Sequence, residues 1–139
     1  HASSALRPEA SALSTDACVP ISRLAECVSA TAKDIEASGM IGPIVGHVGD
    51  GNFHVLLLVD TNNPEEVATA DDIISRLASR AIEMEGTCTG EHGIGQGKQK
   101  YMQQEHGNAL VLMQAIKSAL DPKNILNPGK IWPEALPKA

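Results

Sequence analysis

The amino-acid sequence predicts an α+β fold of the ferredoxin-like split βαβ type, with the element order β-α-β-β-α-β and a C-terminal helical segment after it. Two amphipathic helix patterns predict it, together with two neighbouring strand patterns that lie between them. We therefore expect a linker or cut end at residues 1–12, a ferredoxin-like domain at 13–90, and a loop, helices and a tail at 91–139.

The first half of this pattern is a strand followed by a helix. Residues 13–19 form a short run that is typical of a strand. Pro20 suits the first turn of a helix, and apolar residues then recur with helical period as far as Gly39, a residue type common just past a helix end. Two β-rich runs follow, at residues 41–48 and 53–60, and four turn residues separate them.

The second helix has a clear start signal. Asn63 can cap it, Pro64 suits its first position, and Gly86 is expected to end it. Residues 87–89 make a short fourth strand, and a further helix is expected around residues 108–120. These elements complete the predicted order.

Composition limits the class of protein. The formal net charge of −6 argues against a nucleic-acid partner, whose binding surface would be basic, and no apolar run approaches the ~20 residues that span a bilayer. The three cysteines lack C-x-x-C spacing, so we expect no disulfide framework and a reducing, cytoplasmic compartment, with peripheral membrane association left open. The chain starts at His1, which we interpret as the cut end of a longer protein.

The strongest local prediction concerns two histidines in the segment GHVGDGNFH, residues 46–54. Asp-Gly between strand residues is typical of a two-residue type I′ hairpin, and a loop of Asp50 and Gly51 sets His47 opposite His54. Opposed residues have Cβ atoms ~4.5–5.5 Å apart, so both imidazoles could reach one metal ion. The alternative is a pair of ordinary sheet histidines.

A carboxylate and a third histidine follow the short fourth strand. Split βαβ sheets typically have the strand order 4-1-3-2, so Glu91 would have to approach the hairpin from an end of the sheet or through the loop after it. His92 has a side-chain type suited to general base chemistry, because its reference pKa lies near 6.5. The alternative for both residues is a solvated loop pair.

Three motifs closely resemble one family of flavoenzymes. They are GHVGDGNFH at 46–54, GTCTGEHGIGQGK at 86–98 and DPKNILNPGK at 121–130. They resemble the C-terminal part of FAD-linked 2-hydroxyacid dehydrogenases of the vanillyl-alcohol-oxidase type, a group that includes cytochrome-linked D-lactate dehydrogenase, glycolate oxidase and D-2-hydroxyglutarate dehydrogenase. The similarity runs from about residue 15 to residue 131.

The resemblance implies roles for four of the residues above. It implies that His47, His54 and Glu91 bind one divalent metal ion, for which Zn or Mn is expected. It also implies that His92 removes the hydroxyl proton of a 2-hydroxy acid while the α-hydrogen leaves as hydride to FAD.

The cofactor and partners also follow from the resemblance. It implies that FAD is bound mainly by an N-terminal domain absent from this chain, and that Asn127, Gly129 and Lys130 lie near it. Residues 13–90 would then be a cap domain, and residues 91–139 a catalytic loop, helices and a tail that return to the FAD domain. A cytochrome or a quinone is the expected electron acceptor, mitochondria are the expected compartment in a eukaryote, and this fragment alone is expected to be inactive.

Two departures from the hydroxyglutarate branch bear on the substrate. Leu56 stands where that branch has Asn, and Ser14 aligns near a Lys of that branch. The partners of a distal carboxylate are therefore lost. Residues 15–24 also resemble the lactate branch, so we expect D-lactate or a similar short 2-hydroxy acid as substrate.

Two other functions remain open from the sequence. The chain could be a stand-alone metal-binding or regulatory ferredoxin-like module that forms a homodimer through its sheet, because the helices of such a fold cover only one face. A zinc hydrolase with Glu91 as base is the third reading, and it leaves only two protein ligands for the metal.

Overall fold

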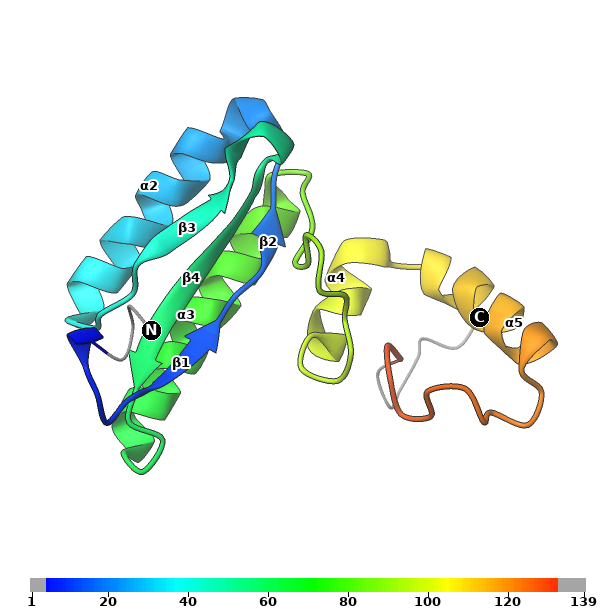
Figure 1. Ribbon diagram of the computed structural model, residues 1–139. Helices are drawn as coiled ribbons and strands as arrows, with labels where there is room; N and C mark the ends of the chain where they lie inside the picture. The colour runs from blue at the N-terminus through cyan, green and yellow to red at the C-terminus, as the bar shows by residue number, and fades with distance from the viewer. Residues whose placement is uncertain (1–4, 133–139) are drawn as a thin grey trace. The chain divides into compact units, whose positions relative to one another are not determined.

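The computed structural model describes residues 5–132. The first four residues of the expected linker and residues 133–139 of the expected tail lie outside the described residues. The described chain forms two compact units, which divide between Glu91 and His92 (Figure 1).

The first unit has two long helices and a small antiparallel sheet, so the predicted α+β class is confirmed. Its elements are β1 (Ser11–Ser14), β2 (Ala17–Cys18), α2 (Ile21–Ser38), β3 (Ile44–His47), β4 (Asn52–Val59) and α3 (Pro64–Glu83).

β4 is the central strand of the sheet. It pairs with β3 on one side and with β1 and β2 on the other, in each case antiparallel. The expected fourth strand is reduced to a single antiparallel bridge between Thr87 and Cys18. The order is nevertheless the predicted one, because Thr87 pairs with the first strand pattern, which pairs with the third, which pairs with the second.

The first strand differs from its prediction in two ways. It begins at Ser11, inside the expected linker, and it is interrupted at Thr15 and Asp16. The register is the same on both sides of the interruption, since Ser14 lies opposite Leu56 and Ala17 opposite Phe53. Asp16 therefore falls opposite His54, and the interruption distorts the strand without shifting its register.

Both long helices cover the same face of the sheet (Figure 1). Alternate residues of β4 point toward them and are buried, because side chains along a strand alternate between its faces. The residues on the helix-covered face are Phe53, Val55, Leu57 and Val59. His54 belongs to the opposite face, which the helices leave open.

The helix signals in the sequence are confirmed. α2 ends at Ser38, and Gly39 follows it with a φ of 70° in the left-handed region. Asn63 caps α3, its Oδ1 accepting hydrogen bonds from the backbone N–H of Glu65 at 3.1 Å and of Glu66 at 3.5 Å.

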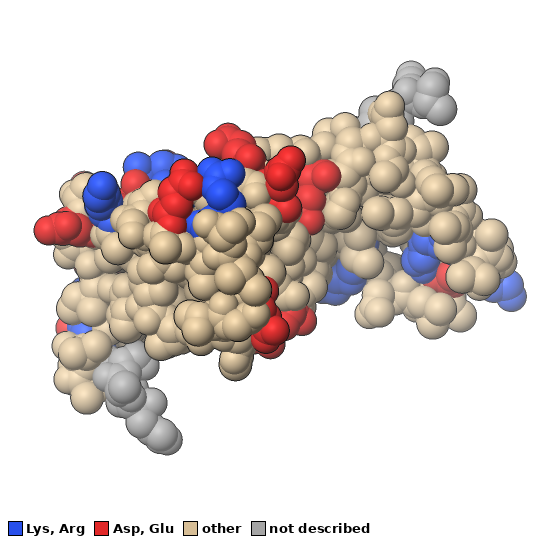
Figure 2. Space-filling view, turned by 90° about the horizontal axis from the view of Figure 1, so that it is seen from above, with Lys and Arg blue, Asp and Glu red and all other residues tan. Residues whose placement is uncertain are grey.

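Acidic and basic side chains are interspersed on the face of the molecule in Figure 2.

In its described residues, 92–132, the second unit contains two α-helices, α4 (Met102–His106) and α5 (Ala109–Leu120). The predicted helix at 108–120 is confirmed as α5, whereas α4 was not predicted. Several large apolar side chains of α5 and of the loop after it are exposed: Leu112, Ile116, Leu120, Ile125 and Leu126. Among the described residues, no helix is both long enough and apolar enough to cross a membrane.

Candidate metal centre

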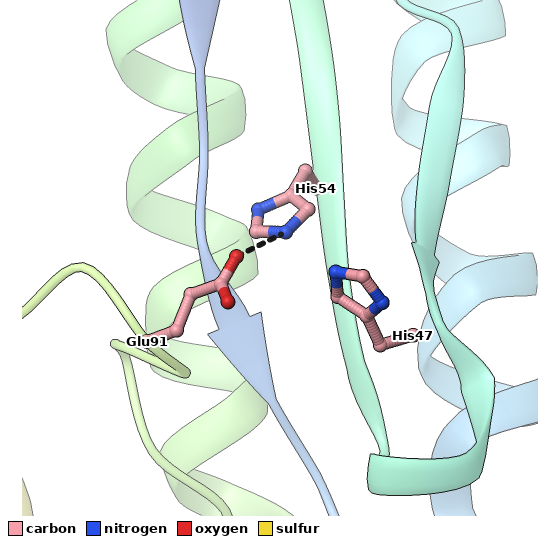
Figure 3. A group of neighbouring side chains, drawn as sticks. All are labelled: His47, His54 and Glu91. Carbon is pink, nitrogen blue, oxygen red and sulfur yellow. Dashed lines mark ion pairs between the residues drawn. The ribbon is translucent and has the colours of Figure 1, made fainter.

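Three side chains of the first unit converge on the open face of the sheet. Each of His47, His54 and Glu91 offers one ligand atom, and these atoms all lie within 4.8 Å of one another. Figure 3 shows His47 at the end of β3, His54 on β4, and Glu91 reaching toward them from the loop beyond the first strand. The three residues predicted from the sequence are therefore brought together by the fold.

The turn that presents His47 differs from the predicted one. Residues 48–50 form a turn of 3₁₀ helix, Gly51 has a φ of 74°, and His47 lies opposite Asn52 rather than opposite His54. The predicted two-residue loop of Asp50 and Gly51 is thus wrong. The backbone N–H of Val19 donates to the Gly51 carbonyl at 3.0 Å, and a Cβ on Gly51 would overlap the Val19 carbonyl, so a tertiary contact with the segment after β2 fixes this turn.

The imidazole of His54 is held by the interruption in the first strand. The hydroxyl oxygen of Thr15 accepts the backbone N–H of Val55 at 2.8 Å, which leaves the Thr15 carbonyl available. That carbonyl lies 2.9 Å from Nδ1 of His54. Because a carbonyl only accepts, Nδ1 donates to it, and Nε2 is the nitrogen that faces Glu91.

The loop after Thr87, which pairs with Cys18 of the first strand, carries the side chain of Glu91 to His54 on β4. Oε1 of Glu91 is 3.2 Å from Nε2 of His54, and the Glu91 backbone N–H donates to Oδ2 of Asp16 at 3.0 Å. The loop route anticipated from the strand order is therefore the one the chain takes.

Burial differs among the three side chains in a way that suits an accessible site. His54 is buried, with 9% of its surface exposed, whereas His47 is exposed and the Glu91 side chain is 49% exposed. The buried His54 is fixed by the sheet, whereas the side chains of His47 and Glu91 are accessible to solvent. His47 and His54 have ring centroids 6.3 Å apart with nearly perpendicular planes.

The donor set suits a divalent metal ion. Two imidazole nitrogens and one carboxylate oxygen are ligands typical of catalytic zinc sites, which hold three protein ligands and leave a position open. Ligand atoms on one such ion lie about 3–4 Å apart for bond lengths of ~2.0–2.2 Å. The present spread of 4.8 Å closes with small movements of the two exposed side chains.

A thiol near this site has a perturbed pKa. Burial raises the pKa of the Cys18 thiol, and the charges of Asp16 and Asp50 raise it further. Cys18 donates its S–H to the carbonyl of Asp50 at 3.3 Å. The residue is therefore a neutral thiol that braces the β3–β4 turn, and no disulfide joins any of the three cysteines, all of which lie in the described part of the chain.

The remaining predicted residues belong to the second unit. His92 follows Glu91 directly and is exposed. Asn127, Gly129 and Lys130 share one turn, in which Asn127 and Gly129 have positive φ and the N–H of Lys130 donates to the Asn127 carbonyl at 3.3 Å. Gln99 fixes this turn by donating from Nε2 to the Gly129 carbonyl at 2.8 Å.

Comparison with known proteins identifies the family. The family model described as FAD linked oxidases, C-terminal domain, matches residues 1–131. The chain belongs to this family. The resemblance seen in the three sequence motifs is thereby confirmed, and the family implies FAD as cofactor of the parent protein.

Relatives of this FAD-linked oxidase domain are considerably longer. A protein of Danio rerio named as a probable mitochondrial D-lactate dehydrogenase is 50% identical over 132 residues, which are 94% of this chain and 27% of that protein. A mitochondrial cytochrome-type D-lactate dehydrogenase of Kluyveromyces lactis is 47% identical, with 90% and 21% covered. The glycolate oxidase subunit GlcD of Bacillus subtilis is 40% identical, with 84% and 25% covered. The chain thus spans about a quarter of the length of these relatives.

A solved structure supports the fold of the domain. The chain is similar to 4-ethylphenol oxidase from Gulosibacter chungangensis with a TM-score of 0.65, over 94% of this chain and 26% of that one. Their sequences are 23% identical, so this likeness concerns the fold alone.

Proposed function

We propose that this chain is the metal- and substrate-facing C-terminal domain of an FAD-dependent dehydrogenase that oxidises D-lactate or a similar short 2-hydroxy acid to the 2-oxo acid. The observation that carries the proposal is the convergence of His47, His54 and Glu91 on the open face of the sheet. The names of the longer relatives favour this function over a stand-alone metal-binding module.

In this proposal the three ligands hold one divalent ion, Zn or Mn. When bound, such an ion supplies Lewis acidity and a template for the carboxylate and hydroxyl oxygens of the substrate. His54 is fixed with Nε2 toward the site by the Thr15 carbonyl, and exposed His47 and Glu91 complete the ligand set.

His92 is proposed as the general base of the reaction. It takes the proton of the substrate hydroxyl as the carbonyl double bond forms, and the bond between the α-carbon and its hydrogen breaks with both electrons leaving as hydride. FAD, held by another domain of the parent protein, supplies the hydride acceptor. That His92 directly follows Glu91, a proposed metal ligand, supports this role.

Two residues on the open face support a short substrate. Ser14 of β1 and Leu56 of β4 lie opposite each other in the sheet, and Leu56 shares the strand face of His54. A hydroxyl and an aliphatic side chain offer a distal carboxylate neither a cation nor an amide. A substrate that ends in a methyl group, such as lactate, suits this pair better than a dicarboxylate.

The second unit is proposed to face the FAD-binding domain. Exposed apolar side chains on α5, such as Leu112 and Leu120, are the kind of surface that another domain covers. We assign residues 13–90 as the cap and residues 91–139 as the catalytic loop and the return to that domain, with Asn127, Gly129 and Lys130 near the cofactor.

The electron acceptor and the cellular compartment are proposed by analogy with the relatives. A cytochrome or a quinone would reoxidise the flavin, and a eukaryotic parent would be mitochondrial, as the names of the Danio rerio and Kluyveromyces lactis proteins say of them. A homodimer remains an alternative assembly that a mass measurement in solution would test.

The test is elemental analysis of the purified parent protein beside two single variants. His54→Ala should lose most of the bound metal, whereas His106→Ala, which alters a histidine of α4 in the second unit, should keep it. Equal metal content in all three proteins would rule out the proposed metal site.

Turnover tests the reaction in parallel. The parent protein with an artificial electron acceptor should oxidise D-lactate in preference to D-2-hydroxyglutarate, and the 139-residue chain alone with added FAD should be inactive. Preference for D-2-hydroxyglutarate would overturn the substrate assignment. Robust turnover by the 139-residue chain alone would overturn the proposed need for a separate FAD-binding domain.

A further inference from the structure

Asp16 is a buried carboxylate at the interruption of the first strand, and only 5% of its surface is exposed. We propose that Asp16 is a positioning residue of the metal site, which acts by holding Glu91 in place. This inference rests on the proposed function, because it takes Glu91 to be a metal ligand.

The contacts of Asp16 lead to the Glu91 segment. Its Oδ2 accepts the backbone N–H of Glu91 at 3.0 Å and the hydroxyl of Thr89 at 3.0 Å. Hydrogen bonds to a charged acceptor are roughly twice as strong as neutral ones, and burying a carboxylate is costly without them. The pairing of this buried charge with the Glu91 backbone therefore restricts the segment strongly.

Asp16 also adjoins the buried histidine. It lies opposite His54 across the sheet, and its Oδ1 is 3.8 Å from Nδ1 of that ring. One carboxylate thus stands between two of the three ligands, with one oxygen on the Glu91 segment and the other beside His54. The arrangement couples the loop that carries Glu91 to the strand that carries His54.

The side chain of Asn52 contacts the segment before Glu91 from a second side. A Cβ on Gly90 would overlap the carboxamide of Asn52, so the backbone before Glu91 packs directly on that side chain. The Glu91 segment has left the sheet, since its last ladder contact is the bridge between Thr87 and Cys18. Beyond that bridge, the hydrogen bonds of Asp16 and the contact with Asn52 help to fix the position of the Glu91 backbone.

A double-mutant cycle in the full-length parent protein tests the role of Asp16. Metal is removed with a chelator, and Co²⁺, whose visible spectrum reports its ligands, is titrated into the parent protein, Asp16→Ala, Glu91→Ala and the double variant. Partners of metal ligands contribute ~10–100-fold to metal affinity, so Asp16→Ala should weaken Co²⁺ binding by about 10-fold or more. In the Glu91→Ala background the same change should have no further effect, because residues that act through one another are not additive.

Two variants separate positioning from other effects. Asp16→Asn keeps one oxygen that can accept both hydrogen bonds, so its Co²⁺ affinity should lie closer to that of the parent. Asp50→Ala removes an exposed acid in the β3–β4 turn and should leave the affinity unchanged, which excludes a simple effect of net charge. If Asp16→Ala does not fold in a thermal unfolding measurement, the same cycle is run with Asp16→Leu, which fills more of the buried volume and likewise has no oxygen to accept the two hydrogen bonds.

The outcomes are distinct. Weakening by Asp16→Ala that persists in full after Glu91→Ala, or no weakening at all, would overturn the positioning role while leaving the metal site intact. Unchanged Co²⁺ affinity in Glu91→Ala alone would overturn the metal site itself, and the positioning role with it.

Discussion

His47 lies diagonally across the β3–β4 pair from His54, because His47 pairs with Asn52 and His54 pairs with Val45. Compared with the predicted hairpin, the strands are shifted by two residues. A shift of one residue would have moved one histidine to the other face of the sheet, whereas a shift of two keeps both on the same face. The two imidazoles therefore still converge, with a wider separation than directly opposed residues would have.

The close packing of this hairpin leads to a prediction about Gly46. A Cβ there would overlap the Asn52 carbonyl and the Phe53 backbone, so Gly46→Ala should separate the strands beside His47. We expect a lower melting temperature and weaker metal binding, measured by thermal unfolding and by Co²⁺ titration. Gly49→Ala is the matched control, since a Cβ at Gly49 meets nothing within 4 Å. Equal behaviour of the two variants would contradict the β3–β4 register described above.

Substitution of His92 should reduce turnover without reducing the amount of bound metal. His92→Asn removes the proposed base but none of the three ligands, so turnover of D-lactate should fall by about 10²–10⁴-fold, the usual contribution of general base catalysis. The metal content should stay that of the parent protein. Turnover rates and elemental analysis of the same preparation check this, and retained turnover would assign the base elsewhere.

The ion pair between Arg7 and Glu66 predicts how stability depends on pH. The hydrogen bond from Arg7 at 2.8 Å, followed by that from the backbone N–H of Asp60 at 2.9 Å, lowers the pKa of Glu66 to about 2 from an ordinary 4.5. A pKa lowered by folding stabilises the folded state above the unfolded pKa, and this contribution disappears as the pH falls from 4.5 toward 2.

The variant Glu66→Gln should therefore unfold at lower urea concentration than the parent protein near neutral pH. The difference should shrink as the pH falls below 4.5, because the parent then loses the same contribution. Urea unfolding curves at several pH values test this. A difference that stays constant with pH would show that the charge of Glu66 does not stabilise the fold.

The cap of α3 should be worth a measurable amount of stability. Asn63→Ala removes the acceptor for the N–H groups of Glu65 and Glu66 and should lower the free energy of unfolding by about 1 kcal/mol. Metal binding should be unaffected, since the cap lies at the start of a helix on the other side of the sheet. Denaturant unfolding checks the first expectation, and an unchanged midpoint would contradict it.

Much of the fold could be predicted from local signals. The helix from Pro20 to Gly39 and the helix capped by Asn63 were expected from residues whose effect on the backbone is local, and the structure confirms both. The predicted loop of Asp50 and Gly51 was wrong because its shape depends on Val19, a residue far away in the sequence. The interruption at Thr15 depends likewise on a side chain that replaces a backbone acceptor in the sheet.

For the candidate site, the sequence by itself determined the types of side chain that could bind a metal ion, and it placed His47 and His54 on one face of the sheet, because strand alternation depends only on residue parity. Only the tertiary structure decided the register between the two histidines, the contact of His54 Nδ1 with the Thr15 carbonyl, and the hydrogen bond between Asp16 and the Glu91 backbone. Each of these is a contact between segments distant in the chain, and no local pattern encodes such a contact. Glu91 illustrates both contributions: its motif predicts a metal ligand, and the hydrogen bond from its backbone to a buried carboxylate 75 residues earlier is seen only in the tertiary structure.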